Sequence, residues 1–352
     1  MNMKGSISSP GRICLFGEHQ DYLGLPVIPM AINKRLKLNY QLEKNPSYVT
    51  LGSYQVDQVE NMSYTKKPNL SGSIFDYLFA VYNYFWDQMD HKSISKLIID
   101  SNIPIRAGLS SSAALLVATT FLFNKIHNLK YSPKQLAEIA FYCEHDILGV
   151  SCGRMDQYAS SLGGIFYMTS SEKPTIIPLN FDRDAIFVIG NSNIERKADL
   201  PLKTVQESIF HGLRILKYPN LNELNLRTIE KANLTNNQKT KLKGVICVRN
   251  NTKEALDELN KKKQDLDYIG TLLSKQQSYL KSNYGVSHPT LDKMCKISEK
   301  CGALGAKLTG AGFGGCMFAL CINKKVARRI RDELHDIGTA FITTMDSGVR
   351  ED

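Results

Sequence analysis

Arg106-Ala107-Gly108-Leu109-Ser110-Ser111-Ser112-Ala113-Ala114 is the stretch around which the rest of the chain is organised. An apolar run, 96–104, precedes it and a helical pattern, 113–126, follows it. We therefore expect a strand, a loop of small residues and a helix with a serine-rich first turn. Backbone N–H groups and the positive end of the helix dipole would meet there, which suits a phosphate. An ordinary serine N-cap after a glycine turn would give the same pattern, so both interpretations stay open.

Composition places the chain among ordinary globular proteins. Its 352 residues suffice for two domains or one large one, with 43 % apolar and 22 % charged residues. The net charge of +10 comes from scattered lysines and arginines, which favours a solvated surface over a nucleic-acid groove. There is no run of about 18 apolar residues that could span a membrane. The polar segment 1–10 has no apolar signal core. We expect a cytoplasmic monomer with a small-molecule substrate and no nucleic-acid or membrane partner.

Cysteine and histidine spacing gives no sign of a zinc or redox site. Eight cysteines are spread from Cys14 to Cys321 without a Cys-x-x-Cys pair, and the seven histidines lack metal-ligand spacing. Free buried thiols in a reducing compartment are the simplest interpretation.

Periodicity predicts a mixture of helices and strands along the whole chain. We expect strands over 7–16, 26–33, 96–104, 164–168, 175–179, 185–190, 306–309, 316–322 and 339–345, with further strand-like segments in 35–64. We expect helices over 73–88, 113–126, 132–148, 153–161, 202–216, 244–259, 266–284, 289–301 and 325–335. We expect the polar segment 220–243, rich in lysine and asparagine, to be helical with loops and to lie at the surface, and it is also a candidate boundary.

Polar residues crowd the short loop Gly17–Gly24, which joins two predicted strands. Such loops commonly carry substrate contacts, and Arg12 just upstream is a suitable cation for a phosphate or a carboxylate. A polar hairpin turn is the structural alternative.

A second polar group surrounds the predicted break between helices 132–148 and 153–161. Glu144 lies near the end of the first helix, and Arg154 and Asp156 begin the second. An aspartate in a first helical turn is often present only because it favours the helix dipole.

Several common nucleotide and hydrolase sites are excluded. Gly310–Gly315 matches G-x-G-x-x-G, but a predicted strand follows where a dinucleotide site needs a helix. The chain has no Walker P-loop, no protein-kinase signature and no Gly-x-Ser-x-Gly elbow.

Three motifs in fixed order resemble one family. Pro10–Tyr22 (PGRICLFGEHQDY) resembles the substrate signature of galactokinases, and Pro29–Ile32 continues it. Pro104–Ala114 resembles the phosphate loop of the GHMP kinases, and Leu308–Cys316 (LTGAGFGGC) resembles their third motif. Two shorter stretches agree: Cys143–His145 with Cys152–Gln157, and Tyr284–Asp292. Five motifs in register identify the chain as a GHMP-family sugar kinase, closest to galactokinase.

The resemblance implies an α+β fold of two domains, 1–182 and 184–352, with the active site in the cleft between them. It implies a kinase that uses ATP and Mg²⁺ to phosphorylate the anomeric C1 hydroxyl of a monosaccharide, with galactose as the first choice. The residues that it places around the ATP phosphates are Arg106, Gly108, Leu109, Ser110, Ser111, Ser112 and Ala113.

The same resemblance implies roles for the polar residues. Ser112, in preference to Ser111, would hold Mg²⁺ together with Glu144. Asp156 would face the attacking hydroxyl and Arg12 would stabilise charge on the transferring phosphoryl group, as this chemistry requires alignment and charge neutralisation. The sugar contacts implied are Glu18, His19, Asp21, Gly153 and Asp156, and the Gly310–Gly315 turn would complete the pocket.

The match departs from galactokinases in places that concern the sugar. The chain has Cys14 and Gln20 where asparagine and threonine are usual. Segment 191–206 lacks the tyrosine of their Tyr-Asn-x-Arg motif and offers Asn193, Arg196 and Thr204 instead.

Other substrates therefore stay open. Arg12–Cys14 and Ile32–Lys34 also resemble plant galacturonokinases, in which case Arg196 or Lys197 could meet a uronate carboxylate. Glu18 argues against that choice because it adds negative charge. N-acetylgalactosamine and arabinose are further candidates.

Two alternatives concern the class of protein. A non-catalytic sugar sensor related to galactokinase would be altered in the Ser-Ala part of the phosphate loop, whereas Ser112-Ala113 is intact here. Leu15–His19 also resembles mevalonate kinase, but Asp21-Tyr22 and the Cys-Gly-x-Met-Asp-Gln pattern speak against it.

Overall fold

The computed structural model describes residues 3–88, 93–171, 173–179, 181, 185–194, 199–217 and 221–352. Its strands are β1 Met3–Phe16, β2 Ile28–Leu42, β3 Tyr48–Ser53, β4 Gln58–Ser63, β5 Ile94–Ser101, β6 Phe166–Met168, β7 Ile176–Pro178, β8 Ile186–Asn191, β9 Gly305–Thr309, β10 Cys316–Cys321, β11 Thr339–Thr343 and β12 Arg350–Glu351. Its α-helices are α1 Asp76–Phe85, α2 Ser111–Ile126, α3 Pro133–Tyr142, α4 Met155–Leu162, α5 Asp199–Leu216, α6 Leu226–Lys231, α7 Asn236–Leu259, α8 Leu266–Tyr279, α9 Pro289–Lys300 and α10 Lys324–Leu334.

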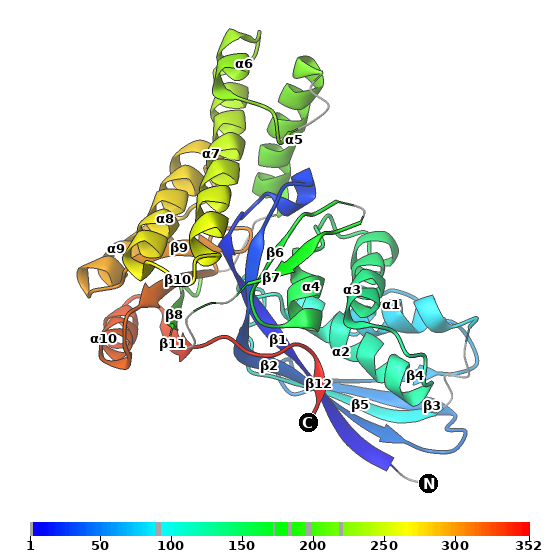
Figure 1. The fold of residues 1–352 in the computed structure, drawn as a ribbon. Helices are drawn as coiled ribbons and strands as arrows, with labels where there is room; N and C mark the ends of the chain where they lie inside the picture. The colour runs from blue at the N-terminus through cyan, green and yellow to red at the C-terminus, as the bar shows by residue number, and fades with distance from the viewer. Residues whose placement is uncertain are drawn as a thin grey trace.

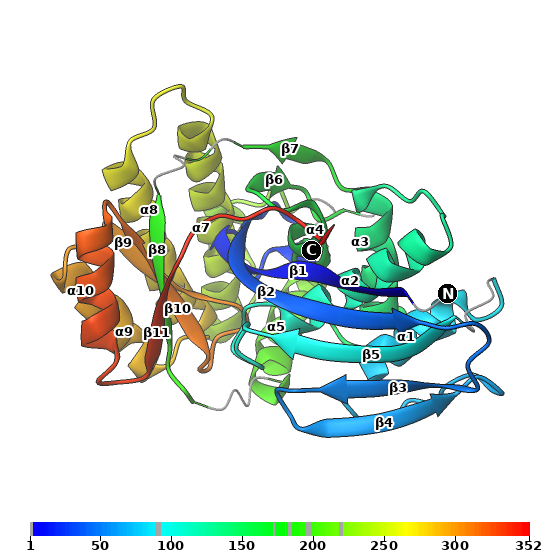
Figure 2. The same cartoon turned by 90° about the horizontal axis from the view of Figure 1, so that it is seen from below.

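Two sheets organise the chain (Figure 1). The first has the order β12-β1-β2-β5-β3-β4 and carries α1 to α4 on one face, as the view from below in Figure 2 also shows. The second has the order β11-β8-β10-β9 and packs against α8, α9 and α10. Helices and strands thus form the α+β architecture predicted from the sequence.

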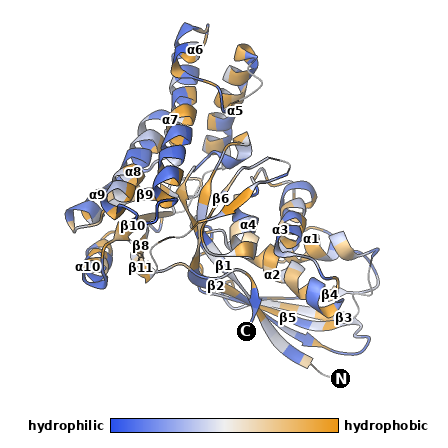
Figure 3. Ribbon diagram, in the orientation of Figure 1, coloured by the Kyte–Doolittle hydropathy of each residue, from blue (hydrophilic) through white to orange (hydrophobic). Residues whose placement is uncertain are grey.

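Helix α2 is the centre of the first core. Its sequence is apolar on all sides, and ten of its residues from Ala113 to Phe123 are buried, as a helix without a polar face should be. Figure 3 shows the hydrophobic colour in α2 and in stretches of the sheets, whereas α10 is mostly hydrophilic. The first core continues into the second sheet through Phe187 and Phe318.

The last residues of the chain return to the first sheet. β12 pairs with β1, and Arg35 on β2 donates to Asp346 and to the carbonyl of Gly348. The end of the C-terminal half is therefore fastened to the N-terminal sheet. The predicted domain boundary between 182 and 184 lies outside the described residues and stays a prediction.

Three predicted helices differ from those observed. The helix predicted over 266–284 ends at Tyr279 and continues as a π-helical turn, Leu280–Tyr284. The predicted helix 132–148 ends at Tyr142 and continues as a π-helical turn, Cys143–Ile147. The helix predicted from 244 begins at Asn236, inside the polar segment that was expected to be helical with loops, because Thr235 and Gln238 form a capping box there.

Candidate active site

The loop between β5 and α2 is shaped by its backbone. Arg106, Gly108 and Ser110 all have positive φ angles, of 53°, 84° and 63°. Ser110 occupies the N-cap position of α2, but its side chain makes no capping hydrogen bond. The alternative of an ordinary serine cap at Ser110 is therefore wrong, and the Ser110 side chain caps none of the first N–H groups of α2.

The Gly310–Gly315 turn packs directly against the backbone of this phosphate loop. A Cβ on Gly310 would lie 2.7 Å from the Gly108 Cα, and one on Gly315 would lie 2.7 Å from the Ala107 carbonyl oxygen. The Cys316 N–H donates to that same oxygen at 3.0 Å. Only glycines permit so close an approach of two backbones, so the third motif fits the phosphate loop through its lack of side chains.

The side chains of the phosphate loop differ in their exposure to solvent. Arg106 is exposed, whereas the Leu109 side chain is buried and its carbonyl oxygen accepts the Arg12 N–H at 3.2 Å. Leu109 can therefore offer only backbone groups to a ligand. The remaining predicted phosphate residues, Ser111, Ser112 and Ala113, form the first turn of α2.

Asp156, in the first turn of α4, is held from two sides. Arg12 Nε and Nη2 donate to its two carboxylate oxygens at 2.8 and 2.7 Å, and Ser110 Oγ donates to Oδ2 at 2.5 Å. Arg12 Nη1 also donates to the Gly108 carbonyl oxygen at 2.6 Å. A role for Asp156 confined to the helix dipole is excluded by these contacts, since it joins the phosphate loop to β1.

Arg12 is a firmly charged group. Burial by itself lowers the pKa of its guanidinium, but the charges of Asp156 and Glu18 more than offset this and raise the pKa above the usual value. Its side chain is only 5 % exposed, against 28 % for Asp156. The carboxylate is thus the member of the pair that an incoming substrate can reach.

Glu144 lies on the π-helical turn, next to the phosphate loop. Gln157 donates to its carboxylate at 2.6 Å. Burial raises the pKa of Glu144 to about 7, although a hydrogen bond with Ser112 lowers it. The predicted pair Ser112 and Glu144 is therefore brought together by the fold.

These two residues fit a magnesium ion that is also bound by a nucleotide. Mg²⁺ in phosphate sites commonly takes one or two carboxylates and completes its shell with water and phosphate oxygens. Within the described part of the chain there is no cluster of three or more His, Cys, Asp or Glu residues suited to a metal.

The loop Gly17–Asp21, here called the sugar loop, is held by residues from the C-terminal half. Glu18 is 2 % exposed and its carboxylate lies 3.3 Å from Lys307 Nζ on β9. His19 stacks on Tyr284 with ring centroids 5.5 Å apart, and Gln20 Nε2 donates to the Tyr284 hydroxyl at 2.7 Å. The loop is not a simple hairpin turn, because it contains buried polar groups with distant partners.

Asp21 ends the sugar loop and contacts Gly153. A Cβ on Gly153 would lie 2.1 Å from Asp21 Oδ2, so a glycine is required there. Burial, with the nearby charge of Asp156, raises the pKa of Asp21 to about 7. Asp21 and Gly153, both predicted to contact the sugar, are therefore neighbours.

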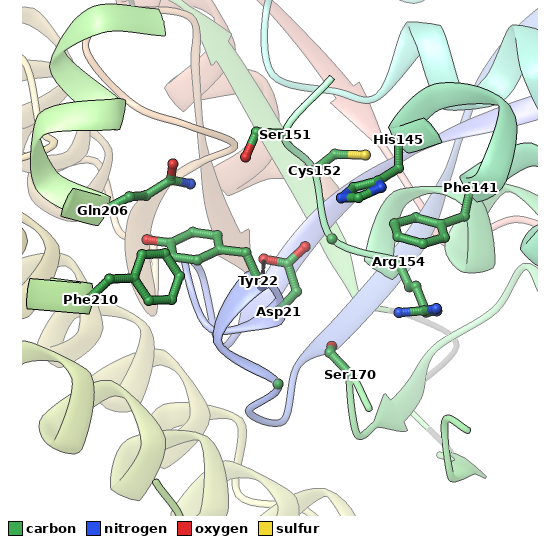
Figure 4. Close-up of a pocket in the computed structure, with 12 residues that line it drawn as sticks. Asp21, Tyr22, Phe141, His145, Ser151, Cys152, Arg154, Ser170, Gln206 and Phe210 are labelled. Atoms are coloured by element: carbon green, nitrogen blue, oxygen red, sulfur yellow. Dashed lines mark hydrogen bonds between the residues drawn. The ribbon is translucent and has the colours of Figure 1, made fainter. Parts of the chain in front are cut away.

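Asp21 and Gly153 also line a pocket of about 250 Å³ (Figure 4). Tyr22 and Phe210 lie on one side of it, with ring centroids 6.4 Å apart, and the stacked rings of Phe141 and His145 lie on the other. Aromatic rings beside a few polar groups are typical of small-molecule sites.

Sequence reasoning did not identify the part of the pocket lining that α5 contributes. Gln206 and Phe210 of α5 line the pocket, whereas the predicted Thr204 is not among the lining residues. Asn193 accepts a hydrogen bond from Thr339 on β11. The predicted Arg196 and Lys197 lie outside the described residues. A helical pattern in 202–216 identified the helix, but no local signal identified its pocket-facing side.

Comparison with known proteins places this geometry in a family. The profile of the GHMP kinases N terminal domain matches residues 76–164, and that of the GHMP kinases C terminal matches 252–339. The galactokinase galactose-binding signature matches residues 2–38. The galactokinase of Pyrococcus furiosus is 32 % identical, over 94 % of this chain and 92 % of its own length. This chain belongs to the galactokinase family of GHMP kinases.

Other relatives agree with that placement. The galactokinase of Thermosipho africanus is 30 % identical over 88 % of this chain and 87 % of its own length. Membership of the galactokinase family makes the chain a phosphotransferase that acts on an alcohol group.

Solved structures share the fold. The Lactococcus lactis galactokinase complexed with galactose superposes with a TM-score of 0.85 at 24 % identity, covering 99 % of this chain and 95 % of its own. The Methanococcus jannaschii mevalonate kinase has a TM-score of 0.76 at 22 % identity, covering 99 % and 98 %. The predicted GHMP kinase fold is thereby confirmed. Over the described residues, no helix is long and apolar enough to cross a membrane.

Proposed function

We propose that the chain phosphorylates galactose with ATP, at the anomeric C1 hydroxyl, to give galactose 1-phosphate. The observation that carries this proposal is the position of Asp156, which Ser110 ties to the phosphate loop and Arg12 ties to the strand leading into the sugar loop. A donor phosphate and an acceptor hydroxyl would meet at that carboxylate.

Asp156 has room for one more hydrogen-bond donor. A carboxylate accepts about four hydrogen bonds, and three are taken: one on Oδ1 by Arg12, and two on Oδ2 by Arg12 and Ser110. The attacking hydroxyl would take the remaining place on Oδ1. Asp156 thus fixes the direction of attack, which is a large part of what a phosphoryl-transfer enzyme supplies.

The start of α2 would bind the ATP phosphates through backbone N–H groups, with the helix dipole favouring negative charge. Ser112 and Glu144 would hold Mg²⁺, which supplies charge neutralisation on the phosphates when bound. Arg12, kept charged by its neighbours, would stabilise negative charge on the transferring group.

The sugar loop supports a neutral sugar over a uronic acid. The charge of Glu18 raises the pKa of Asp21, and the charge of Asp156 raises the pKa of both groups, so the three carboxylates lie within electrostatic range of one another. A substrate carboxylate beside them would add a fourth negative charge, whereas sugar hydroxyls can donate to such acceptors. Galactose remains our first choice, ahead of galacturonate, N-acetylgalactosamine and arabinose.

The groups needed for catalysis are present, which supports an enzyme over a sugar sensor. Ser112-Ala113, Glu144, Arg12 and Asp156 are all present, with Arg12 hydrogen-bonded to Asp156 and Ser112 to Glu144. We also propose a cytoplasmic location, since all eight cysteines are free thiols, and a monomer, which gel filtration would test.

A coupled assay of ADP release tests the function. The enzyme is given Mg-ATP with galactose, N-acetylgalactosamine, arabinose, galacturonate or mevalonate in turn, and the product of the preferred sugar is located by NMR. We expect galactose to give the highest kcat/KM and a phosphate on C1. ATP use that no sugar stimulates would favour the sensor, and preference for another substrate would replace galactose.

A further inference from the structure

Lys307 is a fully buried lysine on β9, in the C-terminal half of the chain. Its side chain is 0 % exposed, and its Nζ lies against three groups. It donates to the Cys14 carbonyl oxygen at 2.8 Å, lies 3.3 Å from Glu18 Oε2 and is 5.1 Å from the Phe318 ring centroid. Burial of a lysine is costly unless its charge is matched, so the position calls for an explanation.

The strand β9, which carries Lys307, makes two side-chain hydrogen bonds to β1. Residues two apart on a strand share one face, and Thr309 lies on the same face of β9. The Cys14 N–H donates to Thr309 Oγ1 at 3.0 Å, while the Cys14 carbonyl accepts from Lys307. β9 therefore engages both backbone groups of one residue on β1, four positions before Glu18.

We propose that Lys307 is a positioning residue for the sugar, which fixes the Glu18 carboxylate in its ionised form beneath the substrate so that it accepts hydrogen bonds from sugar hydroxyls. This inference rests on the proposed function, because it assumes that Glu18 contacts the sugar. It adds that Lys307, which lies about 290 positions away in the chain, keeps the Glu18 carboxylate ionised.

The electrostatics of Glu18 support this role. Burial is the largest influence on Glu18 and raises its pKa, and Asp156 acts in the same direction, while Lys307 and Arg12 lower it. The other titratable groups that face Glu18 are Cys14, Asp21 and Tyr22. Arg12 is already bound to both oxygens of Asp156, so Lys307 is the cation in direct contact with Glu18.

Without the Lys307 charge, Glu18 should become protonated. One of its two carboxyl oxygens then donates a hydrogen bond instead of accepting one. Lys307→Gln keeps an N–H group for the Cys14 carbonyl but removes the charge. We expect its KM for galactose to rise about 10- to 100-fold, the usual effect of losing a hydrogen bond to a charged group. Its KM for ATP and its kcat should change less than about threefold, since the phosphate loop is untouched.

The pH profile separates this role from a packing defect. As pH rises, Glu18 in the Lys307→Gln variant ionises, so the ratio of its KM for galactose to that of the parent enzyme should fall towards one. The ratio is taken at each pH because Asp21, with a pKa of about 7, titrates in both proteins. A loss caused by packing alone would not recover with pH. A second test is the double variant E18Q/K307Q, which should bind galactose no more weakly than E18Q.

Arg35 provides the matched control. It is also a buried cation that links the two halves of the chain, through its ion pair with Asp346, but it has no part in the proposed site. Arg35→Gln should lower the melting temperature and leave the KM for galactose unchanged. Isothermal titration of galactose without ATP should show the same contrast in dissociation constants.

Four results would overturn the proposal: a galactose KM within twofold of the parent in Lys307→Gln, equal losses for ATP and galactose, no recovery with pH, or additivity in the double variant. Lys307→Met serves if Lys307→Gln does not fold, and failure of both to fold would assign Lys307 to stability alone. A parent enzyme that does not phosphorylate galactose would refute the proposed function instead, which keeps the two failures distinct.

Discussion

The phosphate loop and the sugar loop of this protein are built in opposite ways. The phosphate loop takes its shape from backbone: positive φ angles at Gly108 and Ser110, and a glycine turn packed directly behind it. The sugar loop presents buried side chains, each held by a side chain from the C-terminal half, such as Lys307 for Glu18 and Tyr284 for Gln20. A phosphate can be bound by N–H groups and a dipole, whereas a sugar must be recognised by individually placed acceptors.

Asp156 joins the two loops, and its substitution should have the largest effect. Asp156→Asn removes the carboxylate that fixes the attacking hydroxyl, so we expect kcat to fall about 10³-fold or more. ATP and galactose should still bind, because the substitution leaves the phosphate loop and the sugar loop in place. The coupled assay gives kcat, and titration with a non-hydrolysable ATP analogue gives binding.

The control for Asp156→Asn is Asp292→Asn, which removes another aspartate paired with a cation, Lys281. It should keep near-normal turnover. Near-normal turnover in Asp156→Asn itself would contradict the assignment of the site.

Gly310→Ala tests whether the phosphate loop depends on backbone approach. The new Cβ would lie 2.7 Å from the Gly108 Cα, and φ at Gly310 is +81°. We expect the KM for ATP to rise about tenfold, in line with 1–3 kcal/mol of backbone strain. The dissociation constant for galactose should not change.

Gly302→Ala imposes the same kind of φ strain, at +98°, but its Cβ would meet only Val326 methyl groups at 3.7 and 3.8 Å. It should lower stability without changing the KM for ATP. An equal rise in both variants would show that the effect is not local to the phosphate loop.

Serine side chains provide a finer test within the phosphate loop. Ser112 contacts Glu144, so Ser112→Ala should raise the Mg²⁺ concentration needed for half-maximal rate, by about tenfold for a lost ligand. Ser111→Ala should change it less than twofold, because backbone groups serve the phosphates. Titration of the rate with Mg²⁺ at fixed ATP distinguishes the two serines, and the reverse order would move the metal to Ser111.

Asp21 should show the smallest effect, on stability. Its folded pKa of about 7 exceeds the ordinary 3.8, so the stability linked to its proton is full below pH 4 and is lost as pH rises through 7. In Asp21→Asn the side chain cannot ionise, so the variant does not lose this stability as pH rises. Its free energy of unfolding at pH 8 should exceed that of the parent by about 1–2 kcal/mol. Chemical denaturation at pH 8 and pH 5 should show that the difference in unfolding free energy between variant and parent is smaller at pH 5.

Asp352→Asn is expected to act in the opposite direction. Burial alone would raise the pKa of Asp352, but Ser8 and Lys37 lower it below the usual value. Its contribution to stability is therefore present at neutral pH and is lost as pH falls, so the Asn variant should be less stable at pH 8. The same sign for both variants would contradict the burial of Asp21.

The strand, loop and helix around Gly108 were predictable because their signal is local. Small residues between an apolar run and a helical pattern indicate a loop that opens a helix, and that is how β5, Gly108 and α2 are arranged. The resemblance to GHMP kinases added Arg12, Glu144 and Asp156, which the fold brings to the same place. The wall formed by Gln206 and Phe210 was not predictable, since nothing in an amphipathic helix says which face meets a ligand.

The sequence alone determined the family, the α+β fold and the loop that opens α2, because these depend on short motifs and on periodicity within single elements. Only the tertiary structure decided the charge and position of the groups that are predicted to contact the sugar. Asp21 has a pKa near 7 because it is buried beside Asp156, and Glu18 lies against Lys307, about 290 positions away. Burial and long-range contacts set the ionisation of a carboxylate, and the neighbouring residues in the sequence determine neither of them.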